Sequence, residues 1–233
     1  MKRVKTGVPG LDEMLNDGLV ANRPYILVGP PGAGKTIMGM QFLMEGVKNR
    51  EKGLYISLEE STNELEENMS LFGWNLKSIK ILDTSHEIGA DKWLIKANTI
   101  VSKPEFSLVN LMRVMREKMQ VYKPKRIVID SLTSVKMLYE REYDMRRGLL
   151  TLMNFLFKSG TTSLLISTTP SKNMMEEALA SGIIKLHMIE SKGEILNAIS
   201  ISKLRGSNFD KHIRPMKITD EGIVVFSGET MFE

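Results

Sequence analysis

Short apolar runs alternate along the chain with stretches in which apolar residues recur every three or four positions. The runs predict buried parallel strands, and the periodic stretches predict amphipathic helices that pack on them. Strands are predicted at residues 25–28, 53–58, 79–82, 126–130 and 162–168. Helices are predicted from residue 37, from Ser61 to about Phe72, over 108–119 and over 145–156. Ser61 followed by Glu64 has the spacing of a capping box, which marks a helix start.

The pattern changes near residue 183. Residues 183–189 and 195–204 predict two strands of a hairpin joined by 190–194, and residues 213–226 predict a further short pair. We therefore expect an α/β fold with a mostly parallel sheet, flanking helices and antiparallel C-terminal edge strands, in a single domain over residues 1–233. Residues 84–104 lack periodicity, which indicates a functional loop or an insertion.

Residues Gly29–Thr36 read Gly-Pro-Pro-Gly-Ala-Gly-Lys-Thr, the complete G-x-x-x-x-G-K-[ST] pattern of a phosphate-binding loop, or P-loop. The pattern lies between a predicted strand and a predicted helix, as this loop requires. Its glycines let several backbone N–H groups point at one phosphate, and the helix adds its own N-terminal N–H groups. The residues expected to contact ATP or ADP are Gly29, Pro30, Pro31, Gly32, Ala33, Gly34, Lys35, Thr36 and Ile37.

Two residues of the P-loop carry its specific chemistry. Lys35 brings a mobile cation to the β- and γ-phosphates, and the Thr36 hydroxyl is a hard oxygen ligand for Mg²⁺. The alternative is a glycine-rich turn before an ordinary helix, which does not explain why every fixed position of the pattern is present. The sequence therefore predicts a nucleoside triphosphate site.

Polar side chains follow the predicted strands, at the edge of the sheet where the P-loop also lies. Asp130 follows four apolar residues, as a Walker B aspartate does, and we expect it to hold Mg²⁺ with Thr36, directly or through water. Glu59 or Glu60 would position and deprotonate the attacking water. The alternatives are that Asp130 caps the next element and that the glutamates complement the dipole of the helix from Ser61. The same edge should carry Ser167, Thr168 and Thr169.

Lys203 and Arg205 flank Leu204 on a predicted antiparallel strand. Residues two apart share one face of a strand, so both cations should project together while Leu204 packs the other way. Gly206 then allows a sharp turn. Because the strand lies far from the P-loop in sequence, we expect the two cations to contact the nucleotide of a neighbouring subunit. The alternative is a solvated edge strand whose charges block unwanted pairing.

The composition excludes several classes of protein. A hydrophobic fraction of 42% with 26% charged residues indicates a globular chain and not a disordered one. No apolar run approaches the roughly 18–20 residues that span a bilayer, so we expect no membrane span. The absence of cysteine excludes disulfides and thiolate metal sites and fits a reducing compartment. We therefore expect a cytoplasmic protein.

Five motifs now occur in a characteristic order. They are Thr6–Asp12, the P-loop, Glu59–Ser61, Ile129–Ser131, and Lys203–Gly206 followed by Ile218–Ile223. The set closely resembles the KaiC family of RecA-superfamily ATPases, in the single-domain form common in archaea, and it covers nearly the whole chain. The resemblance implies a RecA-like P-loop NTPase core with ATP between adjacent subunits of a homo-oligomer, usually a hexameric ring. It also implies that Glu59 and Glu60 are the catalytic carboxylates and that Lys203 and Arg205 reach the neighbour's γ-phosphate.

Two departures from the family pattern limit what the resemblance implies. The family often has a histidine four residues after the arginine, where this chain has Phe209, with His212 nearby. The adjacent serine and threonine that the clock protein phosphorylates fall near Glu177 and Ala178, where no hydroxyl stands. Autokinase activity is therefore not expected.

The alternative function is ATP-dependent nucleic-acid binding of the recombination or repair kind. The chain has a net charge of +4, and residues 203–217 alone carry five cations against one carboxylate. RecA-like proteins, however, hold DNA with loops that correspond here to residues 131–147 and 168–182. The first has a net charge of +1 and the second is acidic, so neither gives a strong electrostatic footprint.

The favoured function is a Mg²⁺-dependent ATPase that hydrolyses ATP at subunit interfaces. Its cycle would change the conformation of the protein or its binding to an unknown protein partner, in a regulatory role. A signalling switch that reads ATP occupancy, with turnover as a reset, uses the same residues, so the sequence does not separate it from the ATPase.

Overall fold

The computed structural model describes residues 1–84, 108–168, 178–191 and 193–231. Apart from Thr84, the segment 84–104 that we expected to be a functional loop or insertion lies outside these residues. The main sheet is built from the following strands in chain order: β3 (Pro24–Gly29), β4 (Gly53–Ser57), β5 (Ile79–Asp83), β6 (Arg126–Asp130), β7 (Thr162–Thr168), β8 (Gly182–Ser191), β9 (Glu194–Leu204), β10 (Arg214–Thr219) and β11 (Gly222–Val225).

Across the sheet the strands follow the order β11-β10-β9-β8-β3-β7-β6-β4-β5. The strands from β3 to β8 pair in parallel, and β9, β10 and β11 pair antiparallel at one edge. The predicted α/β fold with a mostly parallel sheet and antiparallel C-terminal edge strands is confirmed. The expected connection 190–194 is too long, because Glu190, Ser191 and Glu194 themselves pair in the β8–β9 ladder.

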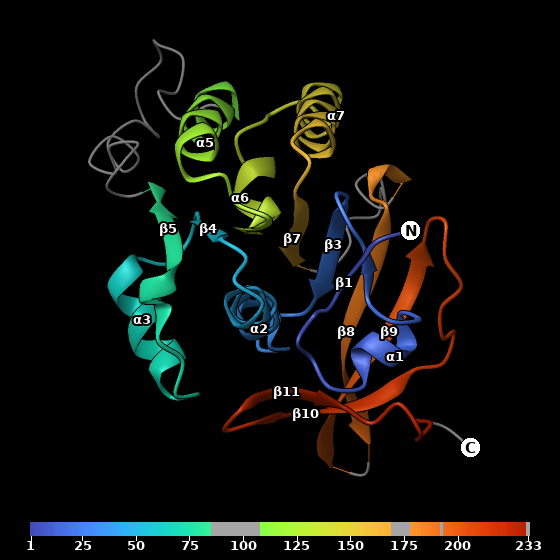
Figure 1. Ribbon diagram of the computed structural model, residues 1–233. Coiled ribbons are helices and arrows are strands. Elements are labelled where there is room, and N and C mark those ends of the chain that lie inside the picture. The colour runs from blue at the N-terminus through green and yellow to red at the C-terminus, as the bar shows by residue number, and fades with distance from the viewer. Residues whose placement is uncertain (85–107, 169–177, 192, 232–233) are drawn as a thin grey trace.

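Helices cover both faces of the sheet (Figure 1). On one side lie α2 (Lys35–Lys48) and α3 (Thr62–Ser70), and on the other lie α5 (Leu108–Tyr122), α6 (Leu132–Lys136) and α7 (Glu142–Lys158). Strand residues alternate between two cores: in β3, Tyr25 and Leu27 pack on the α2 side, while Ile26 and Val28 pack on the α7 side. This two-sided burial explains why β3 appears in the sequence as a continuous apolar run.

The start of α3 has the predicted capping box. The Ser61 Oγ accepts a hydrogen bond from the Glu64 backbone N–H at 3.3 Å, and the Ser61 N–H donates to the Glu64 carboxylate at 2.9 Å. These bonds satisfy donors that a helix start leaves unpaired. The turn from β4 into α3, which carries Glu59 and Glu60, therefore has a fixed end.

The N-terminal segment contains elements that the sequence did not predict: β1 (Arg3–Val4), α1 (Leu11–Met14) and β2 (Leu19–Val20). They are too short for a periodic pattern. The Gln41 side chain of α2 joins this segment to the C-terminal hairpin, because its amide donates to the Gly7 and Ile223 carbonyls and accepts from the Ile223 N–H. Both ends of the chain thus support the helix that begins in the P-loop.

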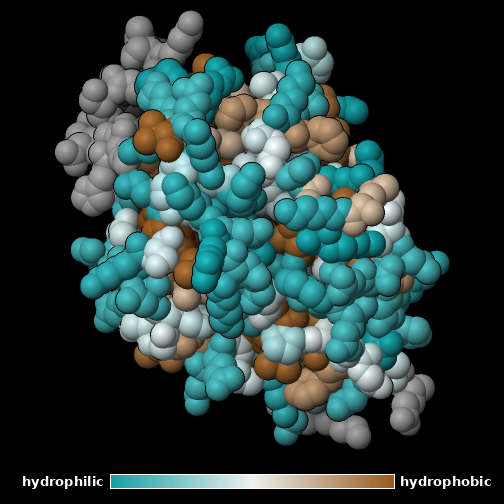
Figure 2. Space-filling view, viewed as in Figure 1, coloured by the Kyte–Doolittle hydropathy of each residue, from teal (hydrophilic) through white to brown (hydrophobic). Residues whose placement is uncertain are grey.

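The surface seen in Figure 2 is mostly hydrophilic, and its hydrophobic side chains lie in small separate groups. Among the residues that the structure describes, no helix combines the length and the apolar character needed to cross a bilayer.

Candidate functional site

The P-loop follows the carboxyl end of β3 and leads directly into α2. Gly32 and Gly34 have φ angles of +81° and +88°, a left-handed conformation that favours glycine. Gly29 is favoured for a steric reason, because a Cβ atom there would lie 2.9 Å from the carbonyl oxygen of Leu186 in β8. Each glycine of the motif therefore has a geometric cause, and the loop has the curvature that sequence analysis predicted.

Lys35 lies at the first position of α2, half-buried beneath the loop. Its ammonium group donates a hydrogen bond to the Pro30 carbonyl at 2.7 Å. Burial lowers the pKa of Lys35, while the nearby carboxylates of Asp130 and Glu59 act in the opposite direction. The structure thus brings this cation close to Asp130 and Glu59, two of the three acidic groups that were expected to share its site.

Asp130, at the end of β6, accepts two hydrogen bonds on one carboxylate oxygen, Oδ2. The Thr36 hydroxyl donates at 2.8 Å and the Tyr55 hydroxyl donates at 2.6 Å. Burial raises the pKa of Asp130, and the two hydroxyl donors oppose that rise. The N-cap of α6 is Ser131 and not Asp130, so the capping role considered for Asp130 is not what the structure shows.

The oxygens of Thr36 and Asp130 suit a magnesium ion. Mg²⁺ takes hard oxygen ligands in an octahedron with metal–oxygen distances of about 2.1 Å, so neighbouring ligand oxygens lie about 3 Å apart. The 2.8 Å separation of Thr36 Oγ1 and Asp130 Oδ2 is close to that spacing. The described residues contain no group of three or more His, Cys, Asp or Glu that could hold a metal. A Mg²⁺ ion here would take its other ligands from phosphate and water.

The two neighbouring glutamates differ in their contacts. Glu59 accepts hydrogen bonds on Oε1 from the Ser131 and Ser134 hydroxyls, the second at 2.7 Å. The Oε2 atom of Glu60 is buried and has no hydrogen-bond partner among the described residues. Burial raises the pKa of Glu60, and the negative charge of Asp130 raises it further. Glu59 is therefore anchored, while Glu60 retains one unpaired oxygen.

The end of β7 carries the hydroxyls expected at this edge. Thr168 pairs with Gly29 in the sheet, and its hydroxyl lies 2.8 Å from that of Thr133 in α6. The Ser167 hydroxyl accepts a hydrogen bond from Lys136 at 3.3 Å. Thr169 lies outside the described residues. These contacts join α6, which carries Ser134, to the strand beside the P-loop.

Lys203 and Arg205 do share one face, as predicted. Both side chains donate to the Ala178 carbonyl, at 3.0 and 2.8 Å, while Leu204 is buried. Gly206 has a φ of +72°, which fits the predicted sharp turn.

These cations lie level with the start of β3, whereas the P-loop of the same chain follows the end of β3. Leu204 pairs with Gly182, and Gly182 pairs with Tyr25 near the start of β3. Gly29 is four residues further along β3, or about 13 Å at the usual rise per residue. The structure therefore does not bring Lys203 and Arg205 to the P-loop of their own chain.

The basic C-terminal stretch has local partners. Arg214 donates to Asp210 at 2.6 Å, and the Lys217 ammonium lies 5.7 Å from the centre of the Phe226 ring. Phe209 packs against the core. The second of the two loops considered for DNA lies mostly outside the described residues, since 169–177 are not among them.

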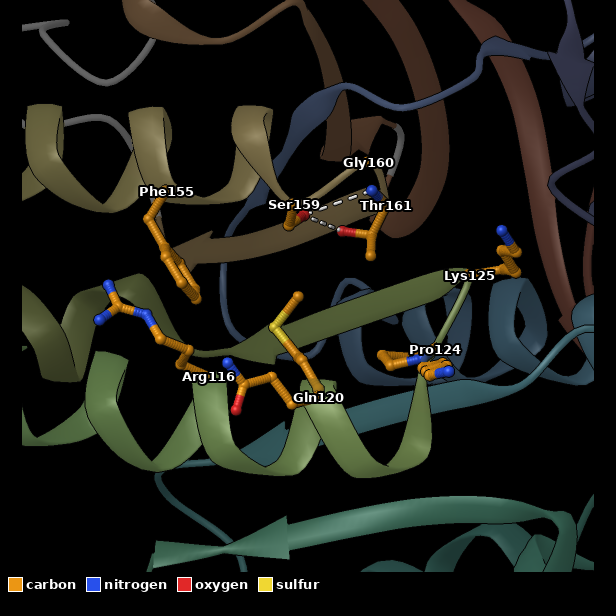
Figure 3. A pocket seen from close by; sticks show the side chains of 10 residues that line it. Arg116, Gln120, Pro124, Lys125, Phe155, Ser159, Gly160 and Thr161 are labelled. Carbon is orange, nitrogen blue, oxygen red and sulfur yellow. Dashed lines mark hydrogen bonds between the residues drawn. The ribbon is translucent and has the colours of Figure 1, made fainter.

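A pocket of about 330 Å³ lies between the C-terminal ends of α5 and α7. Figure 3 shows Arg116 beside the Phe155 ring at one end of it, and the hydrogen-bonded Ser159 and Thr161 at the other. The pocket adjoins the residues that precede β6 and β7, at the edge of the sheet opposite the P-loop. The cations of its lining complement the negative ends of the two helix dipoles.

No individual role was predicted from the sequence for three side chains of the site: Tyr55, Ser131 and Ser134. Tyr55 belongs to an apolar strand, where an aromatic residue ordinarily indicates core packing. Ser134 lies in a helix of five residues, too short to be recognised from periodicity. Ser131, which follows Asp130 directly, was visible as a polar residue at a strand end.

Three comparisons with known proteins agree. A family model described as the KaiC ATPase matches residues 4–230. A UPF0273 protein of Thermotoga maritima is 32% identical, with 98% of each chain covered. The circadian clock protein KaiC2 of Synechocystis is 30% identical over 94% of this chain and 39% of its own. The crystal structure of a KaiC-like protein from Pyrococcus horikoshii superposes with a TM-score of 0.82 at 30% identity, covering 97% of this chain and 99% of the other.

Proposed function

The chain belongs to the KaiC family of RecA-superfamily ATPases, and from that premise we propose that it hydrolyses ATP, with Mg²⁺, where two copies of the chain meet. One observation carries the hydrolytic part: the P-loop, Asp130 and Glu59 lie together, linked through the Thr36–Asp130 hydrogen bond and the electrostatic contact of Lys35 with both carboxylates. These are the parts that phosphoryl transfer requires.

In the proposed mechanism the P-loop N–H groups and the start of α2 hold the phosphates. Lys35 would exchange the Pro30 carbonyl for phosphate oxygens, and Thr36 and Asp130 would hold Mg²⁺, which would supply positive charge against the γ-phosphate. A carboxylate at the end of β4 accepts the proton of the attacking water. Glu59 and Glu60 both remain candidates, the first because it is oriented, the second because it has a free oxygen.

The interface part of the proposal rests on Lys203 and Arg205. In a ring, each subunit would direct this pair at the nucleotide of its neighbour, where the cations would stabilise the charge of the transition state. The pair lies at the opposite end of the strands from the P-loop of its own chain, which supports action between subunits. We propose a homo-oligomer, with a hexameric ring as the expected form.

We further propose that the hydrolytic cycle drives a conformational or partner-binding change with a regulatory role. The chain would act as one ATPase domain over residues 1–233, and the absence of cysteine supports a cytoplasmic location. The nucleic-acid alternative gains no support from Arg214 and Lys217, which make the local contacts described above.

The proposal is tested by phosphate release from ATP by purified protein with Mg²⁺. Wild type should turn over, and Lys35→Ala should release no phosphate above background because it lacks the cation that contacts the phosphates. Lys48→Ala, at the exposed end of the same helix, is the matched control and should behave as wild type. Equal release by wild type and Lys35→Ala would remove the hydrolytic assignment.

A further inference from the structure

We propose that Tyr55 is a positioning residue that fixes the Asp130 carboxylate for Mg²⁺. The inference rests on the proposed function and adds a residue to its metal site. Tyr55 donates a 2.6 Å hydrogen bond to Asp130 Oδ2, the oxygen that Thr36 also contacts. Tyr55 thus fixes the same carboxylate oxygen whose 2.8 Å separation from Thr36 Oγ1 suits two neighbouring Mg²⁺ ligands.

The pairing of β4 with β6 places the Tyr55 hydroxyl near Asp130. Tyr55 lies in β4 opposite Val128 of β6, and two residues later Ser57 lies opposite Asp130. The Tyr55 ring is 1% exposed and packs in the core on the α2 side, together with Phe42 and Val128. Because the ring is buried, packing restricts its hydroxyl to a position beside Asp130 Oδ2.

The two donors to Asp130 differ in what else they do. The Thr36 oxygen is itself a prospective metal ligand, so its geometry changes with the state of the site. The Tyr55 oxygen has no such second role, and it belongs to a ring buried in the core. Tyr55 therefore holds the carboxylate in a position that does not change with the state of the site. Such outer partners typically contribute tenfold or more to metal affinity.

A structural role in the core predicts a different outcome, and a second tyrosine separates the two. Tyr25 is fully buried in β3, and its hydroxyl donates to the Val20 carbonyl at 2.8 Å, away from Asp130. Tyr25→Phe and Tyr55→Phe each keep a buried ring and remove one hydrogen bond. Loss of packing or of stability should affect both alike, whereas loss of metal positioning should affect Tyr55→Phe alone.

The experiment is calorimetric titration with ATP at a series of Mg²⁺ concentrations, and again in excess EDTA. We expect Tyr55→Phe to raise the Mg²⁺ concentration for half-maximal enhancement of ATP binding by about tenfold. Its ATP affinity in EDTA should equal that of wild type, and Tyr25→Phe should match wild type in both conditions. In an Asp130→Asn background, Tyr55→Phe should have no further effect, because the group it positions is gone.

An unchanged Mg²⁺ dependence in Tyr55→Phe would overturn the inference and leave the proposed ATPase intact. An equal shift in Tyr25→Phe, or an undiminished shift in the Asp130→Asn background, would also overturn it, because the effect would then not pass through Asp130. A wild-type protein whose ATP binding is insensitive to Mg²⁺ would contradict the proposed function as well.

Discussion

Glu59 and Glu60 are neighbours in sequence with different surroundings. Two serine hydroxyls orient the Glu59 carboxylate, while Glu60 has a buried oxygen without a hydrogen-bond partner among the described residues and a pKa raised by burial. A general base needs both a fixed direction and an available oxygen. The two bonds to Glu59 end on Oε1 alone, and Glu60 has an unpaired Oε2, so substitution must separate their roles.

We predict that Glu59→Gln binds ATP with wild-type affinity and loses hydrolysis by roughly 10²-fold or more, the usual scale for a positioned base. The change keeps the size of the side chain and its acceptor oxygen for Ser134, so the fold should not change. Single-turnover phosphate release, with ATP binding measured in parallel, checks the prediction. If Glu60→Gln alone gives this loss, the roles of the two residues are exchanged.

For Lys35 the prediction concerns binding. Lys35→Ala should abolish tight ATP binding, because no second lysine or arginine belongs to the P-loop motif. Equilibrium dialysis measures the affinity directly, with Lys48→Ala as the control. Unchanged affinity in Lys35→Ala would contradict the assignment of the loop.

At this scale the sequence predicted best those residues whose chemistry is tied to a local pattern. Gly32, Gly34 and Lys35 follow from one motif, because spacing along the chain fixes their relation. Tyr55 could not be found that way. Its contact with Asp130 depends on the register of two strands that are far apart in sequence.

Among the elements, the connection from β9 to β10 is held by one ion-paired carboxylate. Asp210 accepts hydrogen bonds from Arg214 at 2.6 Å and from the His212 N–H at 2.9 Å. Burial alone would raise the pKa of Asp210, but these bonds outweigh it and lower the pKa. The stabilisation is therefore present above the ordinary carboxyl pKa of about 3.9 and is lost as pH falls through the lower folded value.

We predict that Asp210→Asn lowers the free energy of unfolding by about 1 kcal/mol at pH 7, the usual scale for a charged hydrogen bond that is not fully buried. At pH 3, below the ordinary carboxyl pKa of about 3.9, the difference from wild type should be smaller, because the unfolded chain then takes up a proton that the folded carboxylate resists. Urea unfolding at the two pH values measures this. Asp17→Asn is the control and should show little change at either pH, because the Asp17 side chain, which pairs with Lys5, is 71% exposed. A loss for Asp210→Asn that is independent of pH would contradict the ion-pair account.

Helices and strands were predicted correctly where the periodicity of apolar residues extended over enough positions to be recognised. The buried strands and α2, α5 and α7 appear at the expected places, and the period of two correctly put Lys203 and Arg205 on one face. The short elements α1, α6, β1 and β2 were missed, because four or five residues of helix and two residues of strand carry no period. Tertiary contacts, not local propensity, define them.

In the whole molecule, the P-loop lies at the carboxyl end of β3, and the Lys203–Arg205 pair lies level with the opposite end of that strand. This separation supports our proposal that the pair acts on the nucleotide of a neighbouring subunit in a head-to-tail ring. Arginines supplied from outside a site accelerate related phosphoryl transfers by roughly 10³–10⁵. Arg205→Ala should accordingly bind ATP and hydrolyse it poorly.

Hydrolysis between subunits is tested most directly by mixing two inactive variants, Arg205→Ala and Glu59→Gln, and measuring phosphate release. In randomly mixed rings about a quarter of the interfaces combine an intact Glu59 from one subunit with an intact Arg205 from the next. We predict that the mixture regains activity of that order relative to wild type, while each variant alone stays inactive. No recovery at any mixing ratio, with subunit exchange demonstrated by a labelled chain, would contradict hydrolysis at a shared interface.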